Sequence, residues 1–360
     1  MSDNMMKWLG SLKSNFSNTK QVTIVMGNEA ADLDSMASAL TYAWYLNLSD
    51  ASGNYFPLIN IPRADFKLRT EAVYLFKEAG VNIDNLLFTE DVDLDKLKAG
   101  NNLKLILVDH NKLASSQTGL ETVITGILDH HADEKAYPSA AATDIRPVGS
   151  CATIVAELFL KDQKDAITGS LGTLLLGTIL LDTVNLDPEA GRVTDDDSKA
   201  AKTLIEVSGL DSKKLFDKLQ FEKFNVSSLG SYDLLRKDYK EWQLGAVKLG
   251  IGSVLLPVED WTVKDPEIKV AFDSYLKERK LNVLLAMNAF TAPEFTRQLV
   301  VYIPDGKLFA DTVSYLEGSS LGLEKIDTGL SAENCVFYNQ KNLGISRKKL
   351  QPLLKDFFEG

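Results

Sequence analysis

Residues 22–35 read VTIVMGNEAADLDS, and this stretch decides the fold. Its apolar start, residues 22–26, predicts a buried β-strand, and the Ala-rich residues 35–46 predict a helix directly after it. Further strand candidates follow at 55–61, 103–108 and 123–128, with a helical pattern at 66–79. Strands that alternate with helices indicate an α/β fold built on a parallel sheet with helices on both faces.

Length and composition limit the classes of protein to be considered. At about 150 residues per domain, 360 residues predict roughly two domains. The formal net charge of −11 provides no general basic face, so we expect neither nucleic acid nor a membrane as a partner. Two cysteines exclude a disulfide scaffold and suit a reducing compartment, so we expect a cytoplasmic protein.

A second domain is predicted after the small, polar segment 225–231 (NVSSLGS). Beyond it, strand-like patterns occur at 246–258, 281–290 and 297–303, and helical patterns at 261–280 and 350–358. We therefore place a first domain at 1–224 and a smaller α/β domain at 229–360.

Histidine is the first guide to chemistry, because the chain has only three. His110 follows Asp109 at the end of one strand candidate, and His130 and His131 follow Asp129 at the end of the next. The carboxyl ends of parallel strands face the ligand crevice of an open α/β sheet. Both patches should therefore lie at the same edge of the sheet.

Two further segments place carboxylates after apolar runs. The loop after residues 22–26 carries Asn28, Asp32 and Asp34, and the apolar run Leu174–Leu181 ends at Asp182. Carboxylate and imidazole ligands suit Mg²⁺ or Mn²⁺, whereas carboxylates that converge without a metal repel one another. The sequence thus favours two divalent metal ions that share a bridging carboxylate and a water molecule.

These motifs together resemble a known family. Four segments in this order resemble the motifs of the DHH phosphoesterase superfamily: 28–35 (NEAADLDS), 108–111 (VDHN), 129–134 (DHHADE) and 181–183 (LDT). Residues 346–349 (SRKK) resemble the substrate-binding signature of the DHHA2 domain. The resemblance implies a DHH metallophosphoesterase domain at 1–224, a DHHA2 substrate-binding domain at 229–360, and an active site in the cleft between them.

Within this superfamily the chain resembles the exopolyphosphatases of the eukaryotic type. Asn28 stands where the family II pyrophosphatases have His, and residues 61–63, 68–69 and 238–242 are also similar to the exopolyphosphatase branch. The implied activity is metal-dependent hydrolysis of the terminal phosphoanhydride of linear inorganic polyphosphate, which releases orthophosphate. The alternatives are a family II type pyrophosphatase and a prune-like interaction protein of low activity.

The resemblance also implies roles for individual residues. It assigns one ion, Mg²⁺ or Mn²⁺, to Asp34, Asp109, His130 and Asp182. It assigns a second ion to Asp32 and Asp109, with Asn28 nearby. The catalytic residues are His131, at the phosphate or leaving oxygen, and Asp109, which bridges the ions. The substrate-binding residues are Lys240, Arg347 and Lys348. His110 either supports the metal site or is an ordinary hydrogen-bonded histidine.

Two other segments admit a functional and an ordinary interpretation. Residues 149–153 (GSCAT) could bind phosphate at a helix N-terminus. Arg63, Lys67 and Arg69 could line a polyphosphate groove, although a solvated helix face is the simpler interpretation.

Overall fold

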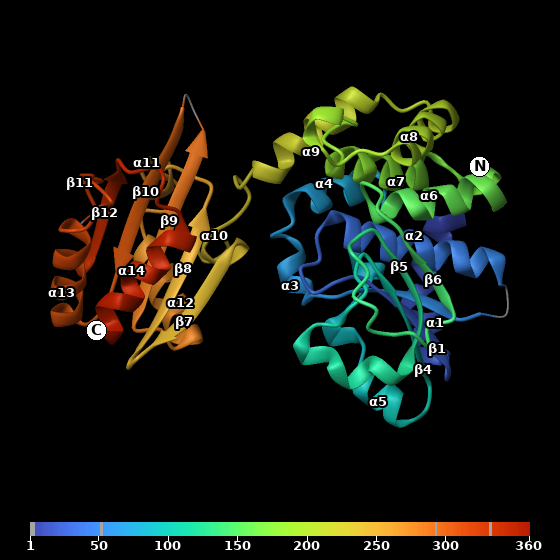
Figure 1. Ribbon diagram of the computed structural model, residues 1–360, viewed down its shortest axis with the longest axis horizontal. Coiled ribbons are helices and arrows are strands. Elements are labelled where there is room, and N and C mark those ends of the chain that lie inside the picture. Colours follow the sequence, from blue (N-terminus) through green and yellow to red (C-terminus); the bar gives the residue numbers. More distant parts are fainter. Residues whose placement is uncertain (1–3, 51–52, 292–293, 331–332) are drawn as a thin grey trace. The chain divides into compact units, whose positions relative to one another are not determined.

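The computed structural model describes residues 4–50, 53–291, 294–330 and 333–360 (Figure 1). The chain forms two compact units, residues 1–223 (unit 1) and 224–360 (unit 2). None of the helices in the described ranges has the length and apolar character that a membrane span requires.

Unit 1 is built on the predicted parallel sheet, which is confirmed. Its six strands lie in the order β3-β2-β1-β4-β5-β6, and every neighbouring pair is parallel. The strands are β1 (Val22–Met26), β2 (Tyr55–Ile59), β3 (Leu87–Phe88), β4 (Leu103–Val108), β5 (Ile124–Asp129) and β6 (Ala142–Ile145). Because the strand order reverses between β1 and β4, the loops after these strands diverge and leave a crevice at the carboxyl edge.

The helices of unit 1 supply the rest of its core. They are α1 (Asn4–Asn18), α2 (Leu33–Ser49), α3 (Arg63–Phe66), α4 (Thr70–Glu78), α5 (Leu94–Ala99), α6 (Cys151–Asp162), α7 (Gly169–Asp182), α8 (Asp195–Ser208) and α9 (Ser212–Phe224). Helix α2 packs against β1, β2, α6 and α7, and its residues 33–44 are all buried. This part of α2 is therefore buried on all sides, as expected for a helix enclosed by other elements.

Unit 2 is a second α/β unit with a mixed sheet in the order β11-β12-β10-β9-β8-β7. Only the β8–β9 pair is parallel among the pairs described. Its strands are β7 (Tyr239–Leu244), β8 (Val247–Val254), β9 (Val283–Thr291), β10 (Phe295–Tyr302), β11 (Leu323–Lys325) and β12 (Cys335–Gln340). Its helices are α10 (Ser231–Lys237), α11 (Val258–Lys264), α12 (Ile268–Arg279), α13 (Gly306–Glu317) and α14 (Arg347–Glu359).

Several sequence-based assignments differ from the structure. The helix expected at 261–280 is two helices, because Pro266 lacks an N–H and disfavours helical backbone at Asp265, which has φ −137° and ψ 88°. The helix expected at 66–79 is likewise interrupted, at Arg69, which has φ −96° and ψ 72°. The apolar run that ends at Asp182 lies in helix α7, and Asp182 is the last residue of that helix.

The core of unit 2 allows a test of packing. Leu299 is fully buried on β10 between its cross-strand neighbours Met287 and Tyr338, whereas Leu343 is 40% exposed. We expect Leu299→Ala to lower the free energy of unfolding by about 2–5 kcal/mol, because it removes buried methyl groups and leaves a cavity. Leu343→Ala should cost less than about 1 kcal/mol. Denaturant unfolding of the full chain measures both, and equal losses would contradict the described core.

Candidate metal centre

The loop after β1 is fixed at both ends by hydrogen bonds. Asp32 caps helix α2, since its Oδ1 accepts the Ser35 N–H at 3.0 Å. Arg69 donates from Nε to the Ala31 carbonyl at 3.1 Å and from a terminal nitrogen to the Ala30 carbonyl at 2.6 Å. Ala31 itself has a left-handed φ of 44°. Arg69 therefore clamps the loop, which is a positioning role that neither sequence interpretation of this residue includes.

Asp34 lies in the first turn of α2 and points at the N-terminus of α6. Its Oδ2 accepts the Cys151 N–H at 2.6 Å and its Oδ1 accepts the Ala152 N–H at 2.9 Å. A helix N-terminus favours an anion because its first N–H groups lack partners within the helix. The expectation that residues 149–153 bind phosphate is therefore wrong for these two amides, because a carboxylate of the protein occupies them.

Asp109 ends β4 in a left-handed conformation, with φ 60°. This conformation is uncommon for a residue other than glycine, and Asp tolerates it better than most. Its Oδ2 accepts hydrogen bonds from the Ser35 hydroxyl at 2.5 Å and from Asn28 Nδ2 at 2.9 Å. Its Oδ1 lies 3.2 Å from His130 Nε2. Asp109 is thus held by one oxygen and presents the other to the histidines.

Asn28 contributes by positioning and uses both ends of its carboxamide. Its Nδ2 donates to Asp109, and its Oδ1 accepts the N–H groups of Ala30 at 2.9 Å and Ala31 at 3.1 Å. With its oxygen occupied in this way, Asn28 orients Asp109 and the loop rather than presenting a ligand atom.

The two histidines of the third motif differ in environment. His130 Nδ1 lies 3.0 Å from the Val148 carbonyl, so Nε2 is left to face Asp109 Oδ1 and, at 3.8 Å, Asp34 Oδ2. His131 Nδ1 lies 2.8 Å from Asp129 Oδ1, and its side chain is 57% exposed. Asp129 is fully buried and also accepts the backbone N–H of both histidines. Asp129 thereby fixes which ring nitrogen of His131 is free.

His110 is placed differently from the other two histidines. Its Nδ1 lies 2.9 Å from the Val108 carbonyl, and its buried Nε2 has no hydrogen-bond partner among the described residues. Burial lowers the pKa of His110. It does not line the cavity described below, and its lowered pKa favours the neutral ring.

Asp182 reaches the site from the C-terminus of α7. The following residues Val184, Asn185 and Leu186 all have left-handed φ values, between 53° and 60°. This tight left-handed turn ends the helix directly after the carboxylate. The Oδ2 atom of Asp182 is buried without a hydrogen-bond partner in the described part of the chain, so it is available to a ligand.

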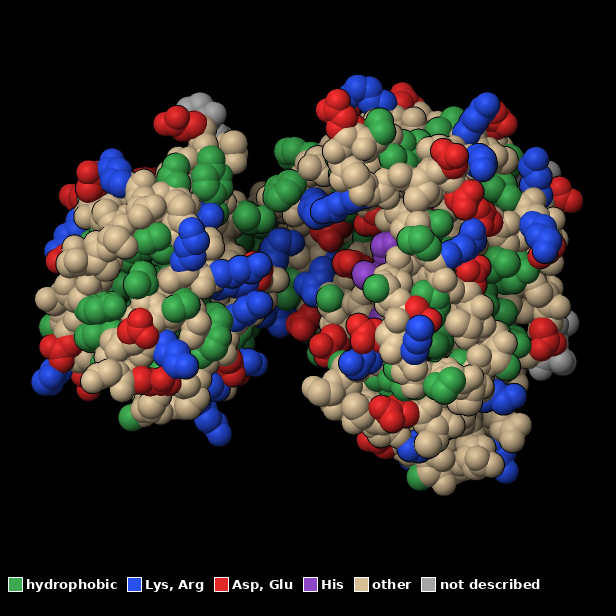
Figure 2. Space-filling view, viewed as in Figure 1, with side chains coloured by type: hydrophobic (Ala, Val, Ile, Leu, Met, Phe, Trp, Pro, Cys, Tyr) green, Lys and Arg blue, Asp and Glu red, His purple; other side chains and the backbone are tan. Residues whose placement is uncertain are grey.

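One cavity of about 470 Å³ gathers the predicted residues of unit 1. Those that line it are Asn28, Asp32, Asp34, Asp109, His130, His131 and Asp182. Figure 2 shows the histidines beside acidic side chains on the surface of this unit. Oxygen or nitrogen atoms of Asp109, His130 and His131 lie within 4.8 Å of one another, a spacing that could hold a metal ion.

The electrostatics of the cavity fit a cation. Burial and the nearby Asp34 raise the pKa of Asp109 to about 7, and burial also raises the pKa of Asp34 and of Asp182. Burial lowers the pKa of His130, but its hydrogen bond with Asp109, the charge of Asp34 and its bond with the Val148 carbonyl together outweigh this and raise the value to about 10. Buried carboxylates that face one another in this way, with one oxygen unpartnered, suit a divalent metal ion with oxygen and imidazole ligands.

The predicted substrate-binding residues lie in unit 2. Arg347 is the first residue of α14 and donates to the carbonyl and the Oδ1 of Asp238, both at 2.7 Å. Lys240 is exposed on strand β7, and Lys348 is exposed next to Arg347. Lys240 pairs in register with Ile251, whose carbonyl also accepts from Arg347 at 3.5 Å. The structure thus brings Lys240 and Arg347 to the same part of this unit.

Asp197 is a supporting residue that sequence reasoning missed. It is fully buried and accepts hydrogen bonds from the Gly149 N–H, the Thr153 hydroxyl, and the N–H and hydroxyl of Thr194. It ties the start of α8 to residues 147–150, which contain the Val148 carbonyl that orients His130. The capping pattern of Thr194 and Asp197 is visible in the sequence, but the long-range contact is not.

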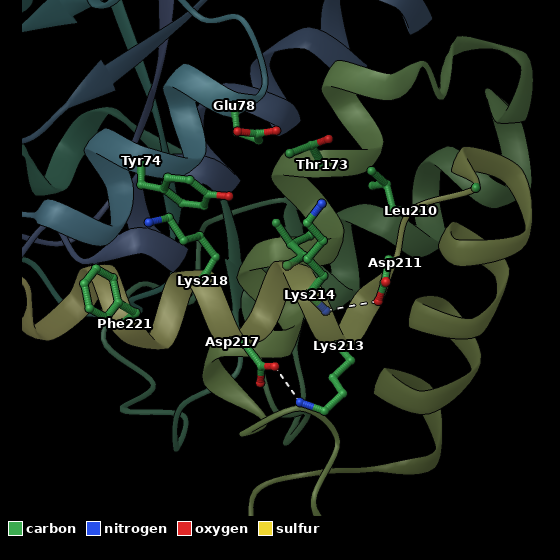
Figure 3. Close-up of a pocket in the computed structure, with 12 residues that line it drawn as sticks. Tyr74, Glu78, Thr173, Leu210, Asp211, Lys213, Lys214, Asp217, Lys218 and Phe221 are labelled. Carbon is green, nitrogen blue, oxygen red and sulfur yellow. Dashed lines mark hydrogen bonds and ion pairs between the residues drawn. The ribbon is translucent and has the colours of Figure 1, made fainter.

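A larger cavity of about 1070 Å³ lies elsewhere in unit 1, between α4, α7 and α9. Figure 3 shows Lys218 between Tyr74 and Phe221, with the Lys218 ammonium 4.8 Å from the centre of the Phe221 ring. Two of its lysines form local ion pairs, Lys213 with Asp217 and Lys218 with Glu222. Because it shares no residue with the metal cavity and contains no histidine, it is not the candidate centre.

Comparison with known proteins agrees with the resemblance. Residues 22–179 match the N-terminal domain of the DHH family, and residues 217–357 match the DHHA2 domain. The chain is 34% identical to exopolyphosphatase PRUNE1 of Mus musculus and of Homo sapiens, over 98% of this chain and 79% of each relative. It is 27% identical to a manganese-dependent inorganic pyrophosphatase of Methanocaldococcus jannaschii, over 84% of this chain and 94% of that protein. The chain belongs to the DHH family, in the group that also carries a DHHA2 domain.

The raised pKa values determine how pH affects the metal-free protein. Asp109 keeps its proton up to about pH 7 in the folded state but loses it near the ordinary value of 3.8 when unfolded. The folded state binds more protons in this range, so this carboxyl makes stability fall as pH rises from about 4 to 7. His130 also makes stability fall as pH rises, in the range between its ordinary pKa of 6.5 and its raised pKa of about 10.

We therefore expect the melting temperature in a chelator to fall between about pH 5.5 and pH 8. Mn²⁺ should raise the melting temperature more at the higher pH, because it binds deprotonated carboxylates. Calorimetric scans measure both effects. Asp109→Asn is the control, because it cannot titrate and its melting temperature should fall less than that of the unaltered protein. An unchanged slope in this variant would show that Asp109 is ionised normally.

Proposed function

We propose that this protein is an exopolyphosphatase, which hydrolyses the terminal phosphoanhydride of linear inorganic polyphosphate and releases orthophosphate. The observation that carries the proposal is the single cavity lined by Asp32, Asp34, Asp109, His130 and Asp182. Membership of the DHH family and 34% identity to proteins named exopolyphosphatase support it. We place the activity in the cytoplasm, in keeping with the sequence.

Two divalent ions, Mg²⁺ or Mn²⁺, fit the proposed ligand set. Asp34, Asp109, His130 and Asp182 would hold one, and Asp32 and Asp109 the other. Ions bound there would lower the pKa of an attacking water and offset the charge of the phosphates. The protein prepares this site by its hydrogen bonds: the α6 amides fix Asp34, Ser35 and Asn28 fix Asp109, and the Val148 carbonyl directs His130 Nε2 inward.

His131 is proposed to act on the substrate oxygens. Its hydrogen bond with Asp129 is the main cause of its raised pKa, and this bond stabilises the protonated form of the ring. Because Nδ1 is held by Asp129, Nε2 is free to donate to a phosphate oxygen or to protonate the leaving chain. The exposure of His131 makes this atom accessible to a substrate.

Lys240, Arg347 and Lys348 are proposed to bind the phosphate chain. All three are basic, and Lys240 and Arg347 lie close together in unit 2. The planar guanidinium of Arg347 suits bidentate binding of phosphate, and Asp238 fixes its orientation. Positive charge supplied locally by these residues and by metal ions accounts for polyanion binding by a protein of net charge −11.

The preferred substrate can be identified by comparing the rates of phosphate release from long polyphosphate, tripolyphosphate and pyrophosphate, each measured with Mg²⁺ and with Mn²⁺. We expect faster release from the longer chains and no release after the metal is removed by a chelator. Asp109→Asn should lose nearly all activity, because it removes the charge that faces both proposed ions. Activity on pyrophosphate alone would instead favour the pyrophosphatase alternative, and none on any substrate would favour the interaction protein.

His131 can be tested separately from the metal ligands. We expect His131→Gln to lower kcat by about 10²–10⁴, the usual contribution of a positioned proton donor, with Mn²⁺ affinity little changed. His130→Gln should weaken Mn²⁺ binding as well as activity. Steady-state kinetics and calorimetric Mn²⁺ titration distinguish the two variants. Equal loss of Mn²⁺ affinity in both would assign His131 to the metal site instead.

A further inference from the structure

One basic residue of unit 1 lines the metal cavity and has no role in the proposed mechanism. Arg192 belongs to the segment 191–194, which forms part of the cavity wall. Among the described residues that line this cavity, it is the only Lys or Arg. The segment contributes none of the proposed metal ligands, so its positive charge is left for another part of the substrate.

The segment that carries Arg192 is firmly attached to the site. Gly191 has a left-handed φ of 64° and ends a short 3₁₀ turn, and Thr194 caps α8. The backbone of Arg192 approaches Gly149 closely: a Cβ atom at Gly149 would lie 2.6 Å from the Arg192 carbonyl oxygen. Asp197 bonds both Gly149 and Thr194. The carbonyl of the neighbouring Val148 orients His130. The backbone at residues 148–149 therefore contacts both Arg192 and a proposed metal ligand.

The charge of Arg192 is not neutralised by its neighbours. The side chain is exposed, and within the described part of the chain Arg192 forms no hydrogen bond or ion pair. Three acids near it in sequence have other partners. Asp196 pairs with Arg146 and Lys199, Asp197 is enclosed by its donors, and Asp187 accepts the Glu189 N–H. This contrasts with Arg347, whose guanidinium is already paired with Asp238.

We propose that Arg192 is a substrate-contact residue of unit 1, which binds the phosphate next to the one held at the metal centre and so favours chains of three or more phosphates. This inference deepens the proposed function and rests on it. A free guanidinium offers several fixed donors to phosphate oxygens, and charge-assisted bonds of this kind are stronger than neutral ones. Because the backbone on both sides of Arg192 is held by hydrogen bonds, the ordering that binding requires is confined to the Arg192 side chain.

The test compares Arg192→Gln with Arg192→Lys and with a charge-matched control, Lys104→Gln. Lys104 is exposed on β4, lies outside the cavity and likewise has no partner among the described residues. We expect Arg192→Gln to raise KM for tripolyphosphate about tenfold or more, with kcat and the KM for pyrophosphate changed much less. Arg192→Lys should have a KM for tripolyphosphate between those of the unaltered protein and Arg192→Gln, because it keeps the positive charge but loses the planar guanidinium with its several donors. Lys104→Gln should match the unaltered protein.

A binding measurement separates this inference from the activity. The probe is a triphosphate chain whose bridging oxygens are replaced by methylene groups, titrated calorimetrically in the presence of Mg²⁺. Weaker binding by Arg192→Gln than by Lys104→Gln supports the contact even if the protein hydrolyses none of the substrates, which would overturn the proposed function alone. Equal binding by these two variants, with unchanged melting temperatures, would overturn the role of Arg192.

Discussion

Repulsion between buried carboxylates is the constraint on which the rest of unit 1 depends. Asp34, Asp109 and Asp182 approach one another in a cavity where burial raises the pKa of each. A fold can hold such a group only by supplying compensating partial charges or a cation. The α6 amides at Asp34, the Ser35 hydroxyl and Asn28 amide at Asp109, and the ring of His130 are those compensations. These groups leave part of the negative charge uncompensated, and a divalent metal ion would compensate it.

The parallel sheet and most of the site could be predicted from the sequence, for a definite reason. Strands β1, β4 and β5 are short apolar runs, and in a parallel sheet their carboxyl ends must lie at one edge. Asp109 and His130 follow β4 and β5 directly, and Asp34 lies in the first turn of the helix after β1, so local pattern and topology together place them. The family resemblance then supplies roles that pattern alone does not.

The other parts of the site depend on contacts between residues far apart in sequence, which a local sequence pattern does not reveal. Asp182 comes from helix α7, so strand-end reasoning did not apply to it. The amides expected to bind phosphate hold Asp34 instead, which is 117 residues away from Cys151 in sequence. Arg69 and Asp197 look like surface residues in the sequence, yet each fixes a loop of the site. Lys240 lies on edge strand β7, where a short polar segment gave little strand signal.

The left-handed turn after Asp182 has a consequence for engineering this protein. Val184, Asn185 and Leu186 all adopt a backbone conformation that costs a residue with a side chain roughly 1 kcal/mol or more, and a β-branched valine is especially disfavoured there. Glycine at position 184 would relieve that strain, so heat tolerance could be raised beside the candidate metal centre without altering any of the proposed metal ligands. The same change would make the turn that follows Asp182 more flexible. One substitution would therefore raise thermal stability and lower the rate of turnover.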